Sequence, residues 1–178
     1  MRHIISVLVE NEFGVLARVA GLFSGRGFNI ESLCVAETLD REISSMTIVT
    51  TGSDSILEQI LKQLNKLVNV IKVTDFQDVE VVSREMVLVK VSADEKTREE
   101  ILRMVEIFRG RIVDVSLKSY VVEITGNEEK VRAFLNLVKP LGIKELVRTG
   151  SVAMMRGERV MRARDRESKG GKDGEGLL

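Results

Sequence analysis

The stretch that decides the fold is SVLVENEFGVLARVAGLFSGRGFNIESL, residues 6–33. The β-branched run at residues 4–9 leads into it and predicts a strand. After Glu10-Asn11-Glu12, apolar residues return at the spacing of one helix face, and Gly25 and Gly27 predict the end of that helix. The predicted apolar face consists of Val15, Leu16, Val19, Leu22 and Phe23. This order predicts a strand, a short polar loop and a helix.

The next residues predict two more strands, a second helix and a closing strand. Residues 28–39 and 43–51 are strand-like runs joined by a hairpin at residues 40–42. Ser55 with Glu58 resembles a capping box at the start of the second helix. The apolar stripe of that helix is Ile56, Leu57, Ile60, Leu61 and Leu64, and the closing strand is residues 69–76. The first half therefore has the order βαββαβ.

The second half repeats this order. Thr97 with Glu100 resembles another capping box, Gly110 ends the helix that follows, and Asn127 is a predicted N-cap. The two predicted helices carry apolar stripes at Ile101, Leu102, Val105 and Phe108, and at Val131, Phe134, Leu135 and Val138 before Pro140. The predicted strands are residues 86–91, 112–117, 120–125 and 145–155.

A βαββαβ order predicts a ferredoxin-like α+β sandwich, in which two helices cover one face of a four-stranded antiparallel sheet. We expect two such domains, at residues 1–78 and 79–157, and a charged, Gly-rich, partly disordered tail at 158–178. Domains of this size are marginal alone, and their bare sheet faces and edges need partners. These come from the other half or from another subunit, and we favour oligomerisation.

Composition restricts the class of protein. Of 178 residues, 44% are hydrophobic, and 27 Lys and Arg balance 27 Asp and Glu. The apolar fraction excludes wholesale disorder, and the zero net charge argues against a nucleic-acid partner. No apolar run reaches the ~18 residues of a membrane span, and no signal peptide is visible. A single cysteine forms no internal disulfide, so we expect a cytoplasmic protein.

Composition also restricts chemistry. The chain has one histidine, His3, and one cysteine, Cys34. Metal sites built from several His and Cys ligands, and nucleophilic triads that need a histidine, therefore have almost no suitable side chains. We therefore predict neither catalytic residues nor metal ligands. A small acid/base enzyme built on carboxylates and lysines remains an alternative, although it would lack the commonest proton carrier.

The loop at residues 10–16 is the most informative candidate site. It places Asn11 and Gly14 where a strand ends and a helix begins. The first N–H groups of a helix have no internal partner and favour a carboxylate, and Gly14 lets a small molecule approach the backbone. Asn11 both donates and accepts hydrogen bonds, which suits an amino-acid zwitterion. A plain helix cap and a plain turn glycine are the simpler interpretation of this loop alone.

A second asparagine, Asn29, lies in the connection after the first helix. In a ferredoxin-like domain that connection is at the opposite end of the helix from Asn11, so the two do not meet within one chain. Two copies joined edge to edge would bring Asn29 of one near Asn11 of the other. A turn or strand-start role for Asn29 is an equal alternative.

Residues 6–33 closely resemble the N-terminal ACT domain of the small, regulatory subunit of acetolactate synthase (acetohydroxyacid synthase). The resemblance continues through SSMTIVTTG, LEQILKQLNKLVNVIKV, REMVLVKV and EIFRGRIVDV, and covers about residues 1–160. The joint pattern ENE-x-G-x-L and GLFS-x-RG-x-NIESL is specific, and EIFRG distinguishes this family from other ACT-containing proteins.

The resemblance implies a regulatory subunit rather than an enzyme. Such subunits bind the large catalytic subunit, which carries thiamine diphosphate, FAD and magnesium, raise its activity and confer feedback inhibition by valine in branched-chain amino acid synthesis. It also implies a homodimer through the ACT domains with valine at their interface. The matching positions are Asn11, Gly14, Val15 and Leu16 of one chain and Asn29 and Ile30 of its neighbour.

The sequence departs from the family pattern at the second strand. Cys34-Val35-Ala36-Glu37 stands where Thr-Val-Ala-Pro is frequent, and Phe13 stands where smaller residues are usual. These changes bear on the strand shape and on whether valine, leucine or isoleucine is the effector. An alternative function is a free-standing ACT-type amino-acid sensor that regulates another partner. Neither the surface for the catalytic subunit nor the role of residues 79–157 is visible in the sequence.

Overall fold

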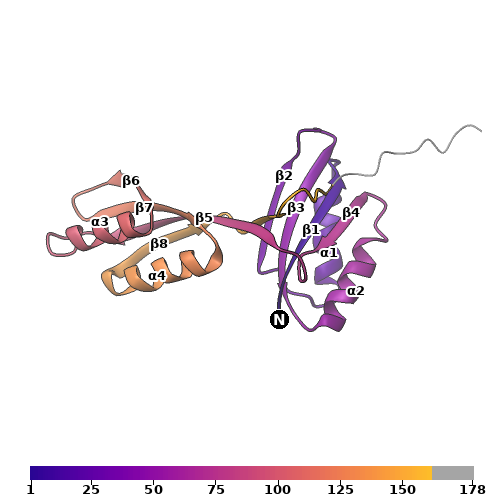
Figure 1. The fold of residues 1–178 in the computed structure, drawn as a ribbon, viewed down its shortest axis with the longest axis horizontal. Coiled ribbons are helices and arrows are strands. Elements are labelled where there is room, and N and C mark those ends of the chain that lie inside the picture. The colour runs from indigo at the N-terminus through magenta and orange to yellow at the C-terminus, as the bar shows by residue number, and fades with distance from the viewer. Residues whose placement is uncertain (162–178) are drawn as a thin grey trace, which may run out of the picture.

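The computed structural model describes residues 1–161, so the predicted disorder of the tail from residue 162 lies outside the described residues. Two domains are visible in Figure 1. The N-terminal domain contains β1 (Arg2–Glu10), α1 (Val15–Ser24), β2 (Ser32–Glu37), β3 (Ile43–Thr51), α2 (Asp54–Leu64) and β4 (Val70–Asp75). The C-terminal domain contains β5 (Val81–Ser92), α3 (Arg98–Ile107), β6 (Arg111–Val115), β7 (Ser119–Gly126), α4 (Glu128–Gly142), β8 (Ile143–Arg148) and β9 (Val152–Met155).

The two sheets have equivalent topologies. The strand order is β2-β3-β1-β4 in the first and β6-β7-β5-β8 in the second, and every pairing is antiparallel. Each sheet has two helices on one face (Figure 1). This confirms the prediction of two ferredoxin-like βαββαβ domains.

Each domain has its own apolar core between sheet and helices. Alternate residues of the central strand β1 point inward because side chains alternate along a strand. The buried members of the first core are Ile5, Val7, Val9, Val15, Val19, Leu22, Phe23, Met46, Ile48, Leu57, Ile60 and Leu64. The second core repeats this arrangement with Val87, Val89, Val91, Ala93, Ile101, Val105, Tyr120, Val122, Ile124, Val131, Phe134 and Val138.

The end of the chain differs from the prediction. Residues 145–155 were expected to form one strand, but the run is broken at Gly150 into β8 and β9, because Gly150 has a left-handed φ of 83°. The strand predicted at 86–91 begins earlier, at Val81. Its extra residues 81–84 pair with β9, so β5 runs from one domain to the other (Figure 1).

The ribbon formed by residues 81–84 and β9 lies against the outer face of the first sheet, where β9 contacts β1. Four residues that point away from the helices of that domain are buried there, namely Ser6, Leu8, Thr47 and Val49. The first sheet is therefore covered on this face by its own chain. Of the two partners that the sequence left open for this face, it is the other half of the chain that covers it, and not the second subunit that we favoured.

The helix starts agree only in part with the predicted caps. Asn127 caps α4, since its Oδ1 accepts the Lys130 N–H at 3.0 Å, as predicted. Ser55 lies inside α2, and the N-cap is Ser53. Thr97 is an N-cap residue, but its hydroxyl donates to the Asp94 carboxylate. That hydrogen bond lowers the pKa of Asp94. Both predicted capping boxes are therefore wrong.

Candidate functional site

The loop between β1 and α1 is fastened to the β2–β3 hairpin by Asn11. The Asn11 backbone N–H donates to the Glu42 carbonyl at 2.7 Å, and Asn11 Nδ2 donates to the Arg41 carbonyl at 2.8 Å. The N-cap of α1 is Gly14, at a left-handed φ of 84°. Asn11 is thus a link between two loops rather than the helix cap that the simpler interpretation assumed.

The N-terminus of α1 is open to a ligand. Its N-cap is a glycine, no side chain caps it, and its first turn holds no acidic residue. A Cβ at Gly14 would meet nothing within 4 Å. Within residues 1–161, no backbone carbonyl accepts the N–H groups of Leu16 and Ala17. The first turn of α1 therefore holds no carboxylate that would neutralise the partial positive charge of the helix end.

Val15 and Leu16 have different surroundings. The Val15 side chain is 3% exposed and belongs to the core, so only its backbone faces the loop. The side chain of Leu16 is exposed. Of these two residues, only Leu16 can present its side chain to a molecule at this surface.

Asn29 and Ile30 lie at the other end of α1, before β2. The Asn29 carbonyl accepts the Thr50 hydroxyl at 2.7 Å, and Ile30 packs against the first core. α1 has 10 residues, or about 15 Å at ~1.5 Å per residue. Within one chain, the structure does not bring Asn29 to Asn11.

Asn69 links the loops around Asn11 and was not recognised in the sequence. Its Nδ2 donates to Glu10 Oε2 at 2.8 Å and to Glu12 Oε2 at 3.0 Å, and its Oδ1 accepts a hydrogen bond from Arg18 Nη1. The side chain is buried. Its partners are more than 50 residues away along the chain, so no local pattern reveals this role.

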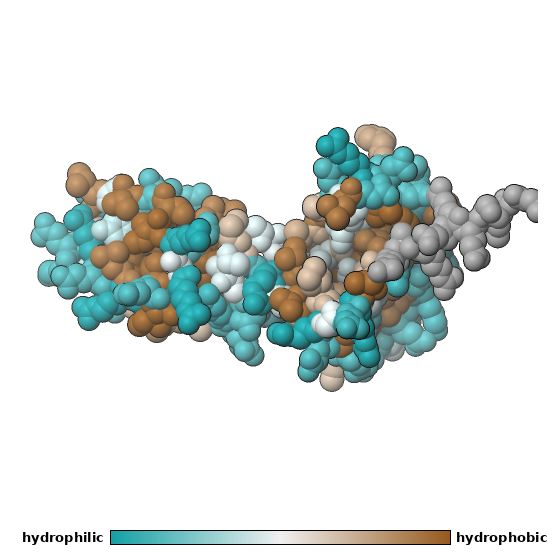
Figure 2. Space-filling view, turned by 45° about the horizontal axis from the view of Figure 1, so that its top comes forward, coloured by the Kyte–Doolittle hydropathy of each residue, from teal (hydrophilic) through white to brown (hydrophobic). Residues whose placement is uncertain are grey.

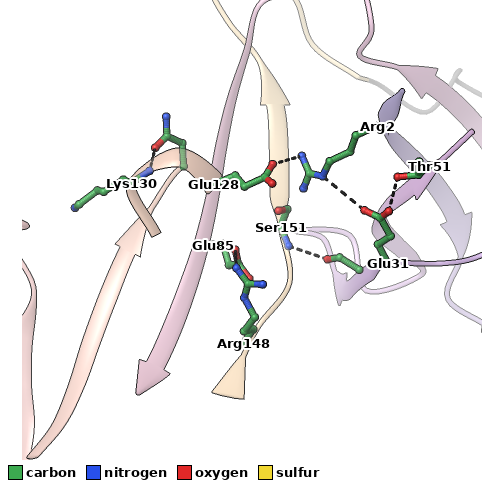
Figure 3. A network of polar contacts seen from close by, with 10 residues as sticks. Arg2, Glu31, Thr51, Glu85, Glu128, Lys130, Arg148 and Ser151 are labelled. Atoms are coloured by element: carbon green, nitrogen blue, oxygen red, sulfur yellow. Dashed lines mark hydrogen bonds and ion pairs between the residues drawn. The ribbon is translucent and has the colours of Figure 1, made fainter. Parts of the chain in front are cut away.

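A polar cleft of about 340 Å³ lies between the two domains and was also missed. Arg2 of β1 lies between two carboxylates, with Nη1 2.8 Å from Glu128 Oε2 and Nε 3.9 Å from Glu31 Oε2 (Figure 3). The Ser151 N–H donates to Ser32 Oγ at 3.0 Å across the same cleft. These contacts tie β1 and β2 to the second domain.

A third ion pair of the cleft joins β5 and β8. Arg148 Nε is 2.8 Å from Glu85 Oε1, and Arg148 Nη2 donates to Glu85 Oε2 at 3.3 Å. Glu85 is buried, and this two-point pairing offsets the cost of burying its charge. Because Arg2 and Arg148 both pair with carboxylates of the chain, we interpret the cleft as a joint between domains.

The remaining candidate groups do not form a chemical centre. His3 is buried in β1 with Nε2 3.1 Å from the Gly52 carbonyl, and Cys34 lies half-buried on the edge strand β2. Among residues 1–161, no group of three or more His, Cys, Asp or Glu is placed to hold a metal ion. The same residues contain no helix long and apolar enough to cross a membrane.

Comparison with known proteins matches both halves of the chain. Residues 5–72 match the "AHAS small subunit-like ACT domain" family, and residues 84–157 match the family "Small subunit of acetolactate synthase". The probable acetolactate synthase small subunit of Archaeoglobus fulgidus is 55% identical over 89% of this chain and 99% of its own length. The acetolactate synthase small subunit of Aquifex aeolicus is 52% identical, over 87% of this chain and 81% of its own.

A solved structure shows the same fold. The acetolactate synthase small subunit of Thermotoga maritima superposes with a TM-score of 0.80 at 45% identity, covering 89% of this chain and 99% of that one. The similarity therefore extends over both domains and over most of the described residues.

Proposed function

We propose that this chain confers feedback inhibition by valine on acetolactate synthase. The chain belongs to the acetolactate synthase small-subunit family. A small subunit is regulatory rather than catalytic, and it associates with the large subunit. We further propose that it activates the large subunit, where thiamine diphosphate, FAD and magnesium supply the chemistry. The effector binds between the N-terminal domains of two copies of the chain.

The observation that carries this proposal is the open N-terminus of α1. An amino-acid carboxylate fits there, because the N–H groups of Leu16 and Ala17 have no backbone acceptor within residues 1–161 and Gly14 leaves space in front of them. Asn11 is held in place by the hairpin, so its amide is fixed beside this position.

Two copies complete the site. β2 is an edge of the first sheet, and two such edges can pair antiparallel around a two-fold axis. The start of β2 in one copy then lies beside the hairpin end of β2 in the other. Asn29 and Ile30 precede the start of β2, and Asn11 is bound to the hairpin, so this pairing brings the two asparagines together.

The energetics require polar anchors as well as an apolar pocket. Burying a valine side chain contributes roughly 1.5–3 kcal/mol, whereas a millimolar dissociation constant corresponds to about 4 kcal/mol. Hydrogen bonds from Asn11, Asn29 and the α1 amides supply the difference. One methylene changes binding by only about 1–3 kcal/mol, so leucine and isoleucine compete with valine for this site.

Binding across two copies also explains how the signal reaches the large subunit. An effector that joins two chains favours one arrangement of the dimer over others, by the difference in its affinity for them. The large subunit responds to that arrangement.

The test is a calorimetric titration of valine into the purified chain, repeated with Gly14→Asp. Aspartate at this position places a negative charge and a side chain in front of the α1 amides. We expect valine binding and valine inhibition to be lost while activation of the large subunit remains. Gly157→Asp is the matched control, because Gly157 also has a left-handed φ, 71°, and open space around its Cβ. Unchanged valine binding by Gly14→Asp contradicts the site.

A further inference from the structure

We propose that one end of the N-terminal domain docks on the acetolactate synthase large subunit. This surface, the loop end, consists of residues 10–14, 38–42 and 65–69. The first range follows β1, the second joins β2 to β3, and the third precedes β4. β1 ends where its antiparallel neighbours β3 and β4 begin, so the three loops lie at the same end of the sheet (Figure 1).

Each loop presents one apolar side chain to solvent. Leu39 and Phe13 are fully exposed, at 107% and 104% relative accessibility, and Val68 is 93% exposed. These are the three highest exposures of large apolar side chains among residues 1–161, and all three occur at one end of one domain. Side chains of this kind gain most from burial against a protein partner, and an aromatic residue at the centre is typical of such contacts.

Hydrogen bonds hold the three loops together. Asn11 joins the first loop to the hairpin, and Asn69 joins the first loop to the third through Glu10 and Glu12. The Glu10 N–H also donates to the Asn69 carbonyl at 2.9 Å. The three apolar residues therefore project from a fixed frame, which lowers the entropy cost of binding.

The family of the chain and the charge of the loop end both indicate that its binding partner is the large subunit. A small subunit needs a surface for its large subunit, and the outer face of the first sheet is already covered by residues 81–84 and β9. The charged residues of the loop end are of both signs with a small acidic excess, namely Glu10, Glu12, Asp40 and Glu42 against Arg41 and Lys66. Such a surface fits an apolar protein patch with a mixed polar rim rather than an anionic membrane or nucleic acid.

The second domain provides an internal comparison. Apolar side chains reach the surface over much of it, as the brown atoms in Figure 2 show. Leu117 lies in the β6–β7 turn, the equivalent of the hairpin that carries Leu39, and is 84% exposed. It is a matched control for substitution of an exposed leucine at a hairpin.

The loop end includes Asn11 and Gly14, so an effector at the α1 N-terminus would border the docked large subunit. That link rests on the proposed function, whereas docking itself does not. The two are tested separately, because docking is measured without any amino acid present.

The experiment measures binding of the full chain to the purified large subunit by biolayer interferometry, for Phe13→Ser, Leu39→Ser, Val68→Ser and Leu117→Ser. Thermal unfolding confirms that each variant is folded, which we expect because these side chains are exposed. Phe13→Ser should bind about tenfold or more weakly and the other two loop-end variants several-fold more weakly. Leu117→Ser should bind like the parent chain.

Four results would overturn the proposal. The first is equal binding by all variants, and the second is equal weakening by Leu117→Ser, which would place docking elsewhere. The third is a change in the oligomeric state of Phe13→Ser without the large subunit, measured by light scattering, which would make Phe13 a contact between copies rather than with the large subunit. The fourth is that the parent chain, but not Phe13→Ser, binds vesicles of anionic phospholipid.

Discussion

Asn69 is the residue with the most connections at the loop end. Its side chain accepts a hydrogen bond from Arg18 and donates hydrogen bonds to Glu10 and Glu12. Its backbone carbonyl accepts the Glu10 N–H at the end of β1. A buried amide with several charged partners is costly to remove, because each partner loses a hydrogen bond inside a half-buried environment. The geometry around Asn11 and Gly14 therefore depends on a residue more than 50 positions later in the chain.

We predict that Asn69→Ala lowers the free energy of unfolding by about 1–3 kcal/mol, because Glu10, Glu12 and Arg18 lose a common partner. Asn65→Ala is the control, since Asn65 is exposed and makes one hydrogen bond to the Leu61 carbonyl. It should cost about 0.5 kcal/mol or less. Urea denaturation measures both. Equal costs for the two variants would show that Asn69 does not organise these loops.

At the level of single residues, the sequence indicates where the candidate site lies but not which groups its residues bind. Asn11 and Gly14 lie between a predicted strand and a predicted helix, and the local sequence pattern is sufficient to predict that position. The partner of Asn11 is a backbone carbonyl 30 residues away, and backbone acceptors leave no mark in the sequence. The cleft residues Arg2, Glu85 and Glu128 form side-chain ion pairs with residues far away along the chain, so no local pattern connects them.

Among the elements, the helix starts show how much local sequence determines. α4 and α2 both begin after a residue of a type that favours the N-cap position. Only Asn127 accepts a hydrogen bond from the helix, whereas the Ser53 hydroxyl is 2.8 Å from the Ser55 hydroxyl. The sequence pattern predicted the cap of α4 correctly, but for α2 it favoured Ser55 over Ser53. The orientation of the side chain then decides whether an N-cap residue stabilises its helix.

We predict that Asn127→Ala lowers the free energy of unfolding by about 1 kcal/mol. The reason is that the Lys130 N–H loses its acceptor. Ser53→Ala should change it by less than about 0.5 kcal/mol, because no helix N–H depends on that hydroxyl. Chemical denaturation of the two variants provides the comparison. A larger loss for Ser53→Ala would contradict the assignment of the caps.

The strands were predictable where an apolar pattern is interrupted by turn residues, as at the hairpin of residues 40–42. The break between β8 and β9 was not predictable, because the sequence does not show that Gly150 takes a left-handed φ and lies against Ser32 of the other domain. The early start of β5 depends on pairing with β9 and is likewise a tertiary effect.

At the scale of the whole molecule, the two domains are connected by the contacts at the cleft between them, which we call the joint. β5 belongs to both domains, β9 lies against the first sheet, and Arg2 bridges Glu31 and Glu128 (Figure 3). Gly150 approaches Ser32 so closely that a Cβ there would be 2.5 Å from Ser32 Oγ. Because Ser32 lies on β2, the joint touches the strand through which we propose that two copies pair.

We predict that Gly150→Ala destabilises the chain by about 2–3 kcal/mol, from about 1 kcal/mol of backbone strain at positive φ and a further clash with Ser32. Gly157→Ala carries the same kind of strain, at φ 71°, with no atom near its Cβ, and should cost about 1 kcal/mol. Thermal and urea unfolding of the pair separate clash from strain. Indistinguishable values would mean that the contact with Ser32 does not hold the domains together.

The central claim is that one effector site takes residues from two copies of the chain. Mixing the Gly14→Asp chain with an Asn29→Ala chain tests it most directly, because each homodimer then has only defective sites. In a mixed dimer, one site combines both defects and the other combines Asn11 and Gly14 of one copy with Asn29 of its neighbour, all unaltered. Calorimetry should show no valine binding by either variant alone and binding at half of the sites in the separated mixed dimer. A mixed dimer that binds no valine, or a single variant that binds it fully, would contradict a shared site.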